Sequence, residues 1–264
     1  MSELKVMTFN LRIEAPEMDG INNLPNRKGK ILATIENEKP DLIGFQEALD
    51  DTRAWLRDSL SDYVFVGCGR LRGFKGESAP LAFRKDRFEM VNMETFWLSS
   101  TPNIPESRYE GTDQSHNPRH VIAVTLKPID SDSLLLFVNT HTDHEGSISR
   151  TLASAQILEY VSSKNLPCVI TGDFNADPCS TEIKMITSCK NFPLVDCTSN
   201  IELTFHGFGK IELYGEKNND EPNKIDYVFT NLETDVNRSY AVEDKHEGGI
   251  YISDHYPVVA YVNI

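Results

Sequence analysis

The chain lacks the features that mark secreted, membrane-spanning and zinc-thiolate proteins. Its five cysteines are odd in number and none of them forms a C-x-x-C pair, which argues against a disulfide framework and against a zinc site. No apolar run reaches membrane-spanning length, and the N-terminal residues lack the apolar core of a secretion signal. These absences predict a cytoplasmic protein with reduced thiols and no contact with a membrane.

Basic residues are also scarce. The sequence contains 26 Lys and Arg against 40 Asp and Glu, so the net charge is −14. A chain with this balance has no broad positive surface for the phosphates of duplex DNA, and we do not expect stable duplex binding. If several carboxylates hold a divalent cation, part of this negative charge is offset locally.

The length of 264 residues suits one large α/β domain, and the sequence has no change of composition and no internal repeat. Strand-like segments lie on both sides of helical patterns at residues 27–38 and 146–164. This order predicts an α/β fold in which two packed β-sheets are flanked by helices. We therefore expect a single domain over residues 1–264.

The most informative stretch is residues 171–178. A buried-looking strand at residues 167–170 leads into Asp173 and Asn175, and an Asp-Pro turn closes the stretch. Side chains two positions apart in a strand face the same side, so Asp173 and Asn175 are expected to project together. A carboxylate and a carboxamide side by side suit a hard cation and a phosphate oxygen. The alternative is an Asx-rich turn that only closes a strand.

Four other expected strands end in polar groups of the same kind. These strands run from residue 6 to Asn10, from residue 41 to Glu47, from residue 137 to His141, and from residue 252 through Asp254 to His255. A single strand-end carboxylate is usually a solvated surface charge. Five strand ends that carry amide, carboxylate and imidazole groups predict a site instead.

Breaker and capping residues give three further expectations about local structure. Residues 11–28 contain proline, glycine and asparagine breakers and are expected to form a loop. Asp50 or Asp51 is expected to cap the helix that follows. Residues 236–242 are expected to form a strand.

Two irregular segments are expected near the site. Residues 67–76 place Arg70 and Arg72 among glycines, and we expect this basic loop to form a rim that recognises a second phosphate or a short nucleotide chain. The alternative is a solvated surface loop. Residues 99–118 are rich in Pro, Ser, Asn and Gly, and a loop of this length is expected to fold over the site as a lid.

Taken together, the motifs resemble the endonuclease/exonuclease/phosphatase superfamily. The resemblance extends from Thr8-Phe9-Asn10 to Ser253-Asp254-His255, and it depends on the whole ordered set of motifs. It implies a four-layer α/β sandwich with two packed, mostly antiparallel or mixed β-sheets flanked by helices. It also implies a Mg²⁺-dependent phosphoesterase, with Mn²⁺ as a possible substitute, in which an activated water attacks the phosphate in line.

The resemblance assigns a role to each matching residue. Glu47 matches the principal metal ligand, Asp254 matches an aspartate that helps to bind the metal, and Asn10 matches an asparagine near the metal and the phosphate. Asp173 and Asn175 match the pair that orients the attacking water and stabilises the pentacovalent phosphate.

The remaining matches concern the phosphate. His141 resembles a phosphate-contacting histidine, with Glu77 in the place of its carboxylate partner. His255 resembles the histidine that faces the scissile phosphate, and Asp226 resembles the aspartate bonded to it. Arg119 resembles an arginine that holds a phosphate oxygen.

Two of the candidate residues have a structural alternative. Asp226 could instead pair with Lys224 on a surface. His206, in a segment typical of a bacterial subgroup, is a candidate substrate-binding residue, but it could equally be a structural histidine.

The substrate is less well defined than the reaction. Tyr227 stands where inositol polyphosphate phosphatases have an arginine, and the motifs are closest to the deadenylase-like and small bacterial hydrolase branch. We expect a nucleotide, a short single-stranded nucleic acid or a small phosphorylated metabolite as substrate. The alternative is a catalytically idle member that binds a phosphorylated ligand or a partner. The sequence does not decide between a monoester and a diester as the bond that is cut, or between one and two metal ions.

Overall fold

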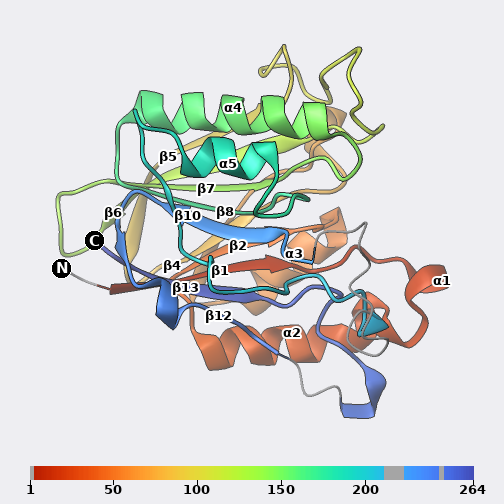
Figure 1. The fold of residues 1–264 in the computed structure, drawn as a ribbon. Helices are drawn as coiled ribbons and strands as arrows, with labels where there is room; N and C mark the ends of the chain where they lie inside the picture. Colours follow the sequence, from red (N-terminus) through yellow and green to blue (C-terminus); the bar gives the residue numbers. More distant parts are fainter. Residues whose placement is uncertain (1–2, 211–222, 244–246) are drawn as a thin grey trace.

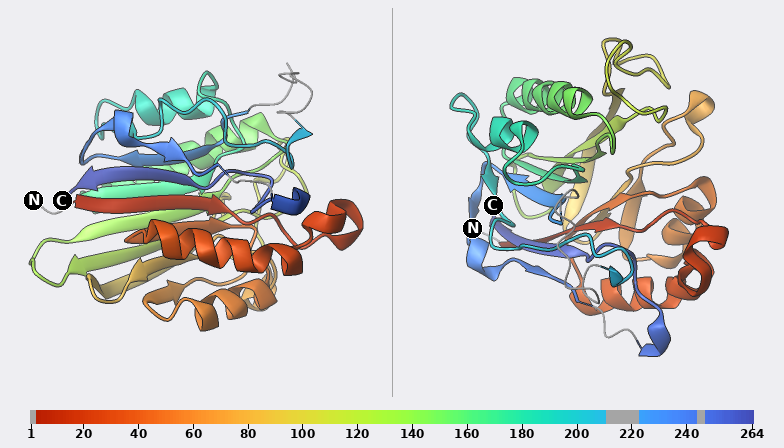
Figure 2. Two further views of the ribbon diagram at one scale, coloured as in Figure 1. Left: turned by 90° about the horizontal axis from the view of Figure 1, so that it is seen from below. Right: turned by 45° about the vertical axis from the view of Figure 1, so that its right-hand side comes forward.

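The computed structural model describes residues 3–210, 223–243 and 247–264. Two β-sheets pack face to face, and helices cover both outer faces (Figure 1), which gives four layers. Figure 2 shows the same arrangement from two further directions, with α2 (Leu24–Glu38) on one outer side and α4 (Ser147–Lys164) on the other. The predicted α/β sandwich with two mixed sheets is confirmed.

The first sheet has seven strands. They are β1 (Glu3–Asn10), β2 (Leu42–Gln46), β3 (Tyr63–Val66), β4 (Leu81–Arg84), β11 (Glu233–Thr234), β12 (Tyr240–Ala241) and β13 (Val258–Asn263). Their order is β11-β13-β1-β2-β4-β3, and β12 also pairs with β13. Among the described residues of this sheet, β1 and β2 are the one parallel pair, and α2 makes the crossover between them.

The second sheet has six strands. They are β5 (Phe88–Trp97), β6 (His120–Pro128), β7 (Leu135–His141), β8 (Cys168–Asp173), β9 (Val195–Asp196) and β10 (Asp226–Thr230). Their order is β5-β6-β7-β8-β10-β9, and the parallel pair β7–β8 is connected by α4. Each sheet therefore has a parallel pair near its centre whose strands end at the same edge.

Apolar side chains alternate between the two faces of each sheet. One cluster fills the space between the sheets and includes Leu42, Phe83, Ile122, Phe137 and Val228. A second cluster packs the outer face of the first sheet against α2 and α3 (Asp50–Ser59), and a third packs the second sheet against α4 and α5 (Thr181–Thr187). Because strand side chains alternate, both faces of the central strands are buried.

A buried polar network joins the two sheets between this apolar core and the site. The Gln46 amide donates to Asn139 Oδ1 at 2.8 Å and to Thr8 Oγ1 at 3.1 Å, and Thr171 Oγ1 donates to Asn139 Oδ1 at 2.9 Å. Gly44 lets the sheets approach here, because a Cβ on it would lie 2.0 Å from Thr171 Oγ1. The network fixes the register of β1, β2, β7 and β8 just below their polar ends.

Three local expectations need correction. Residues 11–28 are not all loop, because α1 (Pro16–Asp19) and a 3-10 turn (Gly20–Asn22) precede α2, which begins at Leu24. Pro25 starts this helix instead of breaking the chain, since a proline in the first turn needs no N–H partner.

Asp50 and Asp51 lie inside the first turn of α3, and Leu49 is the N-cap residue. Asp50 instead accepts a hydrogen bond from the backbone N–H of Gly76. Residues 236–242 form a 3-10 turn (Val236–Arg238) and the two-residue strand β12, because the side chain of Asp235 caps that turn. None of the helices in the described ranges is long and apolar enough to cross a membrane.

Candidate active site

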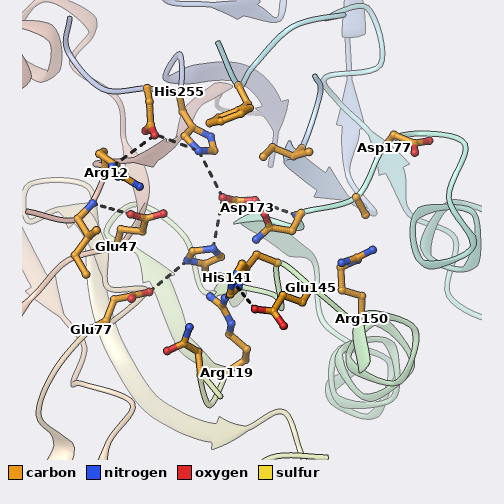
Figure 3. Close-up of a pocket in the computed structure, with 18 of the residues that line it drawn as sticks. Arg12, Glu47, Glu77, Arg119, His141, Glu145, Arg150, Asp173, Asp177 and His255 are labelled. Atoms are coloured by element: carbon orange, nitrogen blue, oxygen red, sulfur yellow. Dashed lines mark hydrogen bonds and ion pairs between the residues drawn. The ribbon is translucent and has the colours of Figure 1, made fainter. Parts of the chain in front are cut away.

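Polar side chains from both sheets meet in one cavity of about 850 Å³. It lies where β1, β2, β7 and β8 end and where β10 begins, and the loop just before β13 completes its lining (Figure 3). Its lining includes Glu47, His141, Asp173, Asp254 and His255. The sequence prediction that these strand ends converge is therefore matched by the geometry, while the role of each residue stays a prediction.

Asp173 lies at the centre of this cavity. Its carboxylate accepts hydrogen bonds from Asn10 Nδ2 and from the backbone N–H of Asn175, both at 2.9 Å. Its Oδ2 lies 3.6 Å from His141 Nε2 and 3.8 Å from His255 Nε2 (Figure 3). Burial, together with the charge of Asp226, raises the pKa of Asp173 to about 7.

Asp226 and His255 form a buried pair. His255 Nδ1 lies 2.8 Å from Asp226 Oδ2, and Asp226 is directly opposite Asp173 in the β8–β10 register. Burial on its own would lower the pKa of His255, but the carboxylate of Asp226, with those of its other acidic neighbours, raises it to about 10. Lys224 does not take part, because it pairs with Asp196 at 2.6 Å. The alternative partner for Asp226 is therefore wrong.

His141 has the opposite electrostatic setting. Burial and the positive charge of Arg119 lower its pKa well below the usual value of 6.5, so the ring is neutral. Its Nδ1 lies 3.5 Å from Glu77 Oε1 and has no hydrogen-bond partner within the described ranges. Glu77 also holds Arg70 at 2.6 Å. The predicted His141–Glu77 pairing is thus present as a loose contact.

Glu47 follows β2 in a left-handed conformation, with φ of 61°. Its carboxylate accepts hydrogen bonds from the backbone N–H of Ile13 at 2.6 Å and from Asn10 Nδ2 at 3.1 Å. Burial would raise the pKa of Glu47, but the hydrogen bond from the N–H of Ile13 and the positive charge of His255 act against it, and the pKa falls below its usual value. This carboxylate therefore stays ionised in the cavity.

Two clusters of the described residues have the spacing of metal ligands, and both include Asp173. One adds Asp226 and His255, but the positive imidazolium already balances that cluster. The other adds Glu47 and His141, and Asp254 lines the same cavity. Oxygen donors of this kind fit a hard divalent cation, so the Glu47 side is the better candidate for one.

Asn175 lines the cavity but does not continue the strand. The chain turns into a left-handed conformation at this residue, with φ of 48°, and Nδ2 donates to the carbonyl of Thr142 at 3.1 Å. The expectation that Asp173 and Asn175 project as strand neighbours is therefore wrong in detail. Phe174 is fully buried between them, as alternation requires.

Arg119 is buried beside the cavity and is only partly paired. Nη2 lies 2.9 Å from His144 Nδ1, and Nε lies 3.6 Å from an oxygen of Asp143. In the part of the chain that the structure describes, Nε and Nη1 of this guanidinium have no hydrogen-bond partner. An unpaired buried guanidinium is costly, so its donors are available to an anionic ligand.

The predicted basic rim is not assembled. Arg70 lines the cavity, but it is buried and its charge is paired with Glu77. The side chain of Arg72 is 84% exposed, lies 3.3 Å from Glu106, and is not among the lining residues. Arg70 pairs with a carboxylate seven residues further along the chain, and Arg72 with one 34 residues further.

His206 does not reach the cavity lining. It is buried and stacks on Tyr256 with a centroid distance of 4.2 Å, and Nδ1 accepts a hydrogen bond from the N–H of Gly209 at 3.0 Å. The geometry fits the structural alternative for this histidine.

Residues 99–118 pack against α4 beside the cavity. Asp113 accepts hydrogen bonds from the first-turn N–H groups of Ile148 and Ser149 in α4 at 2.9 and 3.0 Å. Gln156 of the same helix holds the backbone N–H of Ser99. The segment is therefore tied to α4 at both ends, and its residue Asn117 lines the cavity.

Arg12 is a lining residue that the sequence did not reveal. It lies two positions after Asn10, and its side chain pairs with Asp19 of α1. The only signal was its place just beyond a polar strand end. Arg150 of α4 also lines the cavity and pairs with Glu182 at 2.7 Å.

Comparison with known proteins agrees with the fold. The model of the Endonuclease/Exonuclease/phosphatase family matches residues 7–255. An endonuclease/exonuclease/phosphatase from Bacteroides vulgatus is 29% identical with a TM-score of 0.89, and all of each chain is covered. A mannosyl-6-phosphatase from Bacteroides thetaiotaomicron is 26% identical with a TM-score of 0.78, covering 98% of this chain and 100% of the other.

A protein of Acanthamoeba polyphaga mimivirus, itself uncharacterised, is 24% identical in an alignment 272 residues long. The alignment covers 97% of this chain and 98% of the viral protein. The family match takes in every strand end of the cavity from Asn10 to His255. This chain therefore belongs to the endonuclease/exonuclease/phosphatase family of phosphoester hydrolases.

Proposed function

We propose that this protein is a cytoplasmic, divalent-metal-dependent phosphoesterase that cleaves a small phosphorylated molecule by in-line attack of an activated water. Mg²⁺ is the expected ion, and Mn²⁺ is its expected substitute. The observation that carries the proposal is the chain of contacts Asp226–His255–Asp173–His141 in one cavity with Glu47. This set combines a charged imidazolium, a carboxylate with a pKa near neutrality, and oxygen ligands.

Glu47 and Asp254 would hold the metal ion, with Asn10 between Glu47 and Asp173. Both carboxylates line the cavity together with His255, whose Nε2 lies 4.0 Å from Asp254 Oδ1. A bound divalent cation would polarise a phosphoryl oxygen and offset the negative charge that develops there.

His255 supplies positive charge from the protein itself. Asp226 bonds Nδ1, which leaves Nε2 directed toward Asp173 and Asp254 at 3.8 and 4.0 Å. An imidazolium held in this orientation stabilises the charge of the phosphate in the transition state without reorganising. Arg119 adds unpaired donors from the other side.

Asp173 is suited to accept the proton of the attacking water. Its pKa of about 7 lies near the working pH, where a general base combines availability with basicity. Asn10 and the N–H of Asn175 hold the carboxylate in place. Neutral His141, 3.6 Å from Asp173, can donate a hydrogen bond to the phosphate.

The cavity favours a small and polar substrate. Its volume of about 850 Å³ is that of a site for a metabolite or for a few nucleotides. The relative named mannosyl-6-phosphatase supports a sugar phosphate, and nucleotides or short single-stranded nucleic acids are the other candidates. With a net charge of −14, duplex DNA is a poor partner.

The test measures phosphate release from sugar phosphates and nucleotides, and the cleavage products of short oligonucleotides, with Mg²⁺, with Mn²⁺ and with EDTA. We expect turnover with both ions, loss in EDTA, and loss in Asp173→Asn. Glu94→Gln is the matched control, because Glu94 pairs with Lys164 away from the cavity. Binding of phosphorylated compounds without any release would instead favour the idle, ligand-binding member of the fold.

A further inference from the structure

Arg12 lies in a turn whose backbone N–H groups bind the side chains of Asn10 and Glu47, two of the candidate residues on the metal side. Its φ of 56° is left-handed, a conformation that non-glycine side chains rarely adopt. The N–H of Arg12 donates to Asn10 Oδ1 at 2.9 Å, and the next N–H, that of Ile13, donates to Glu47 Oε2. Strained backbone of this kind is found mainly where the surrounding contacts over-determine it, often at functional sites.

The guanidinium of Arg12 is held in one orientation. Nε and Nη2 both donate to the carboxylate of Asp19, at 3.2 and 3.0 Å. The buried side chain of Arg27 fixes the same turn, because its Nη2 donates to the carbonyl of Arg12 at 3.0 Å. An arginine fixed in this way loses little further conformational freedom when it binds a ligand.

This guanidinium also faces the reacting groups. It lines the cavity, its side chain is 21% exposed, and Nε lies 3.7 Å from Asp254 Oδ2 (Figure 3). The hydrogen bonds found within the described ranges use Nε and Nη2 only. The two N–H groups of Nη1 are therefore left for a ligand on the wall that Glu47 and Asp254 share.

We propose that Arg12 binds a non-bridging phosphate oxygen and so selects phosphomonoester dianions over phosphodiesters. The inference rests on the proposed phosphoesterase function and names its substrate class. A monoester presents three charged terminal oxygens, one of which can meet Arg12 while the others face His255 and the Glu47 side. A diester places a carbon substituent where one of these oxygens would be, which leaves the guanidinium unpaired and removes one negative charge.

The test compares Arg12→Gln with Arg84→Gln. Arg84 is a matched control, because its Nε and Nη2 also hold one aspartate, Asp86, and its side chain is 26% exposed, but it lies at the end of β4 far from the cavity. The substrates are p-nitrophenyl phosphate and bis-p-nitrophenyl phosphate with Mg²⁺. In Arg12→Gln, kcat/KM for the monoester should fall roughly ten- to hundredfold more than kcat/KM for the diester. This is the effect expected when one charge-assisted hydrogen bond is lost. In Arg84→Gln the ratio should not change.

A second measurement does not depend on turnover. At a temperature where both proteins are folded, calorimetric binding of inorganic phosphate to the Mg²⁺-loaded protein should be roughly tenfold or more weaker in Arg12→Gln than in the parent. In Arg84→Gln it should match the parent. Equal losses on both substrates, or unchanged phosphate binding in Arg12→Gln, would overturn the assignment of Arg12. If the parent cleaves neither these esters nor any of the sugar phosphates, nucleotides and oligonucleotides named above, the proposed function fails, and phosphate binding alone then decides the role of Arg12.

Discussion

The pairing of Asp226 with His255 can be tested by changing Asp226 to Asn. In the folded protein the pKa of His255 is raised from 6.5 to about 10, which corresponds to a preference for the charged ring of about 5 kcal/mol. Burial opposes this shift, and Asp226 is the largest of the three carboxylates that produce it. In Asp226→Asn the carboxylates of Asp173 and Asp254 remain, 3.8 and 4.0 Å from His255 Nε2. We therefore expect the pKa of His255 to lie between 6.5 and about 10 in this variant.

The expected kinetic effect is a loss of turnover with little change in KM. A neutral amide no longer stabilises the imidazolium and permits the wrong tautomer, and the same change in Ser-His-Asp triads lowers kcat about 10⁴-fold. We expect a loss of roughly 10²- to 10⁴-fold in kcat for Asp226→Asn. The pKa of His255 in the metal-free protein can be followed by NMR titration of its ring.

Two results would refute this reasoning. One is an unchanged pKa of His255 in Asp226→Asn, and the other is a kcat within about threefold of the parent, which corresponds to less than 1 kcal/mol. The double variant with His255→Ala separates a shared role from two independent ones. If the residues act as a unit, the double variant is no slower than His255→Ala, whereas additive losses would contradict the pairing.

Three other predictions concern the metal side, the response to pH and the contact between the sheets. Glu47→Gln should weaken Mg²⁺ binding in calorimetry and remove most activity with an unchanged far-UV spectrum; parent-like metal binding would contradict its role. Burial lowers the pKa of His120 to about 4, so the neutral ring stabilises the fold above pH 6.5 and this stability is lost as the pH falls toward 4. In urea unfolding between pH 7 and pH 4.5, the free energy of unfolding of His120→Asn should therefore decrease by about 2–3 kcal/mol less than that of the parent. Equal decreases would contradict the role given to His120. Gly44→Ala should destabilise by about 2 kcal/mol or more because its Cβ would collide with Thr171, while Gly29→Ala in α2, which meets nothing within 4 Å, should be neutral or stabilising.

The sequence predicts the parts of the site that depend on local periodicity. Asp173, His141 and Asn10 end strands whose alternation is plain in the sequence, and parallel strands bring such ends to one edge. The fold class follows from the same strands and from the helices between them. The prediction of a loop at Pro25 was wrong because a proline breaks a helix in its interior but is tolerated in the first turn, where Pro25 lies.

The parts that were missed depend on partners that the local helix and strand periodicity does not indicate. Arg70 and Arg72 resemble a free basic loop until Glu77 and Glu106 are placed beside them. Residues 99–118 have the composition of a lid, but Asp113 finds the first turn of α4, which no local pattern indicates. Arg12 gains its importance only when Asp19 and Asp254 come close.

The polar network between the sheets has a mechanical consequence. Sliding one sheet past the other by a single residue would move its strand ends by about 3.3 Å. That distance is larger than the 2.9 Å hydrogen bond between Asn10 of β1 and Asp173 of β8, which joins the two sheets at the site, so this contact would not survive such shear. The bond from Gln46 of β2 to Asn139 of β7 resists it directly below the site. The surrounding loops can therefore exchange residues and alter which phosphate ester is accepted, while the reacting groups keep their spacing.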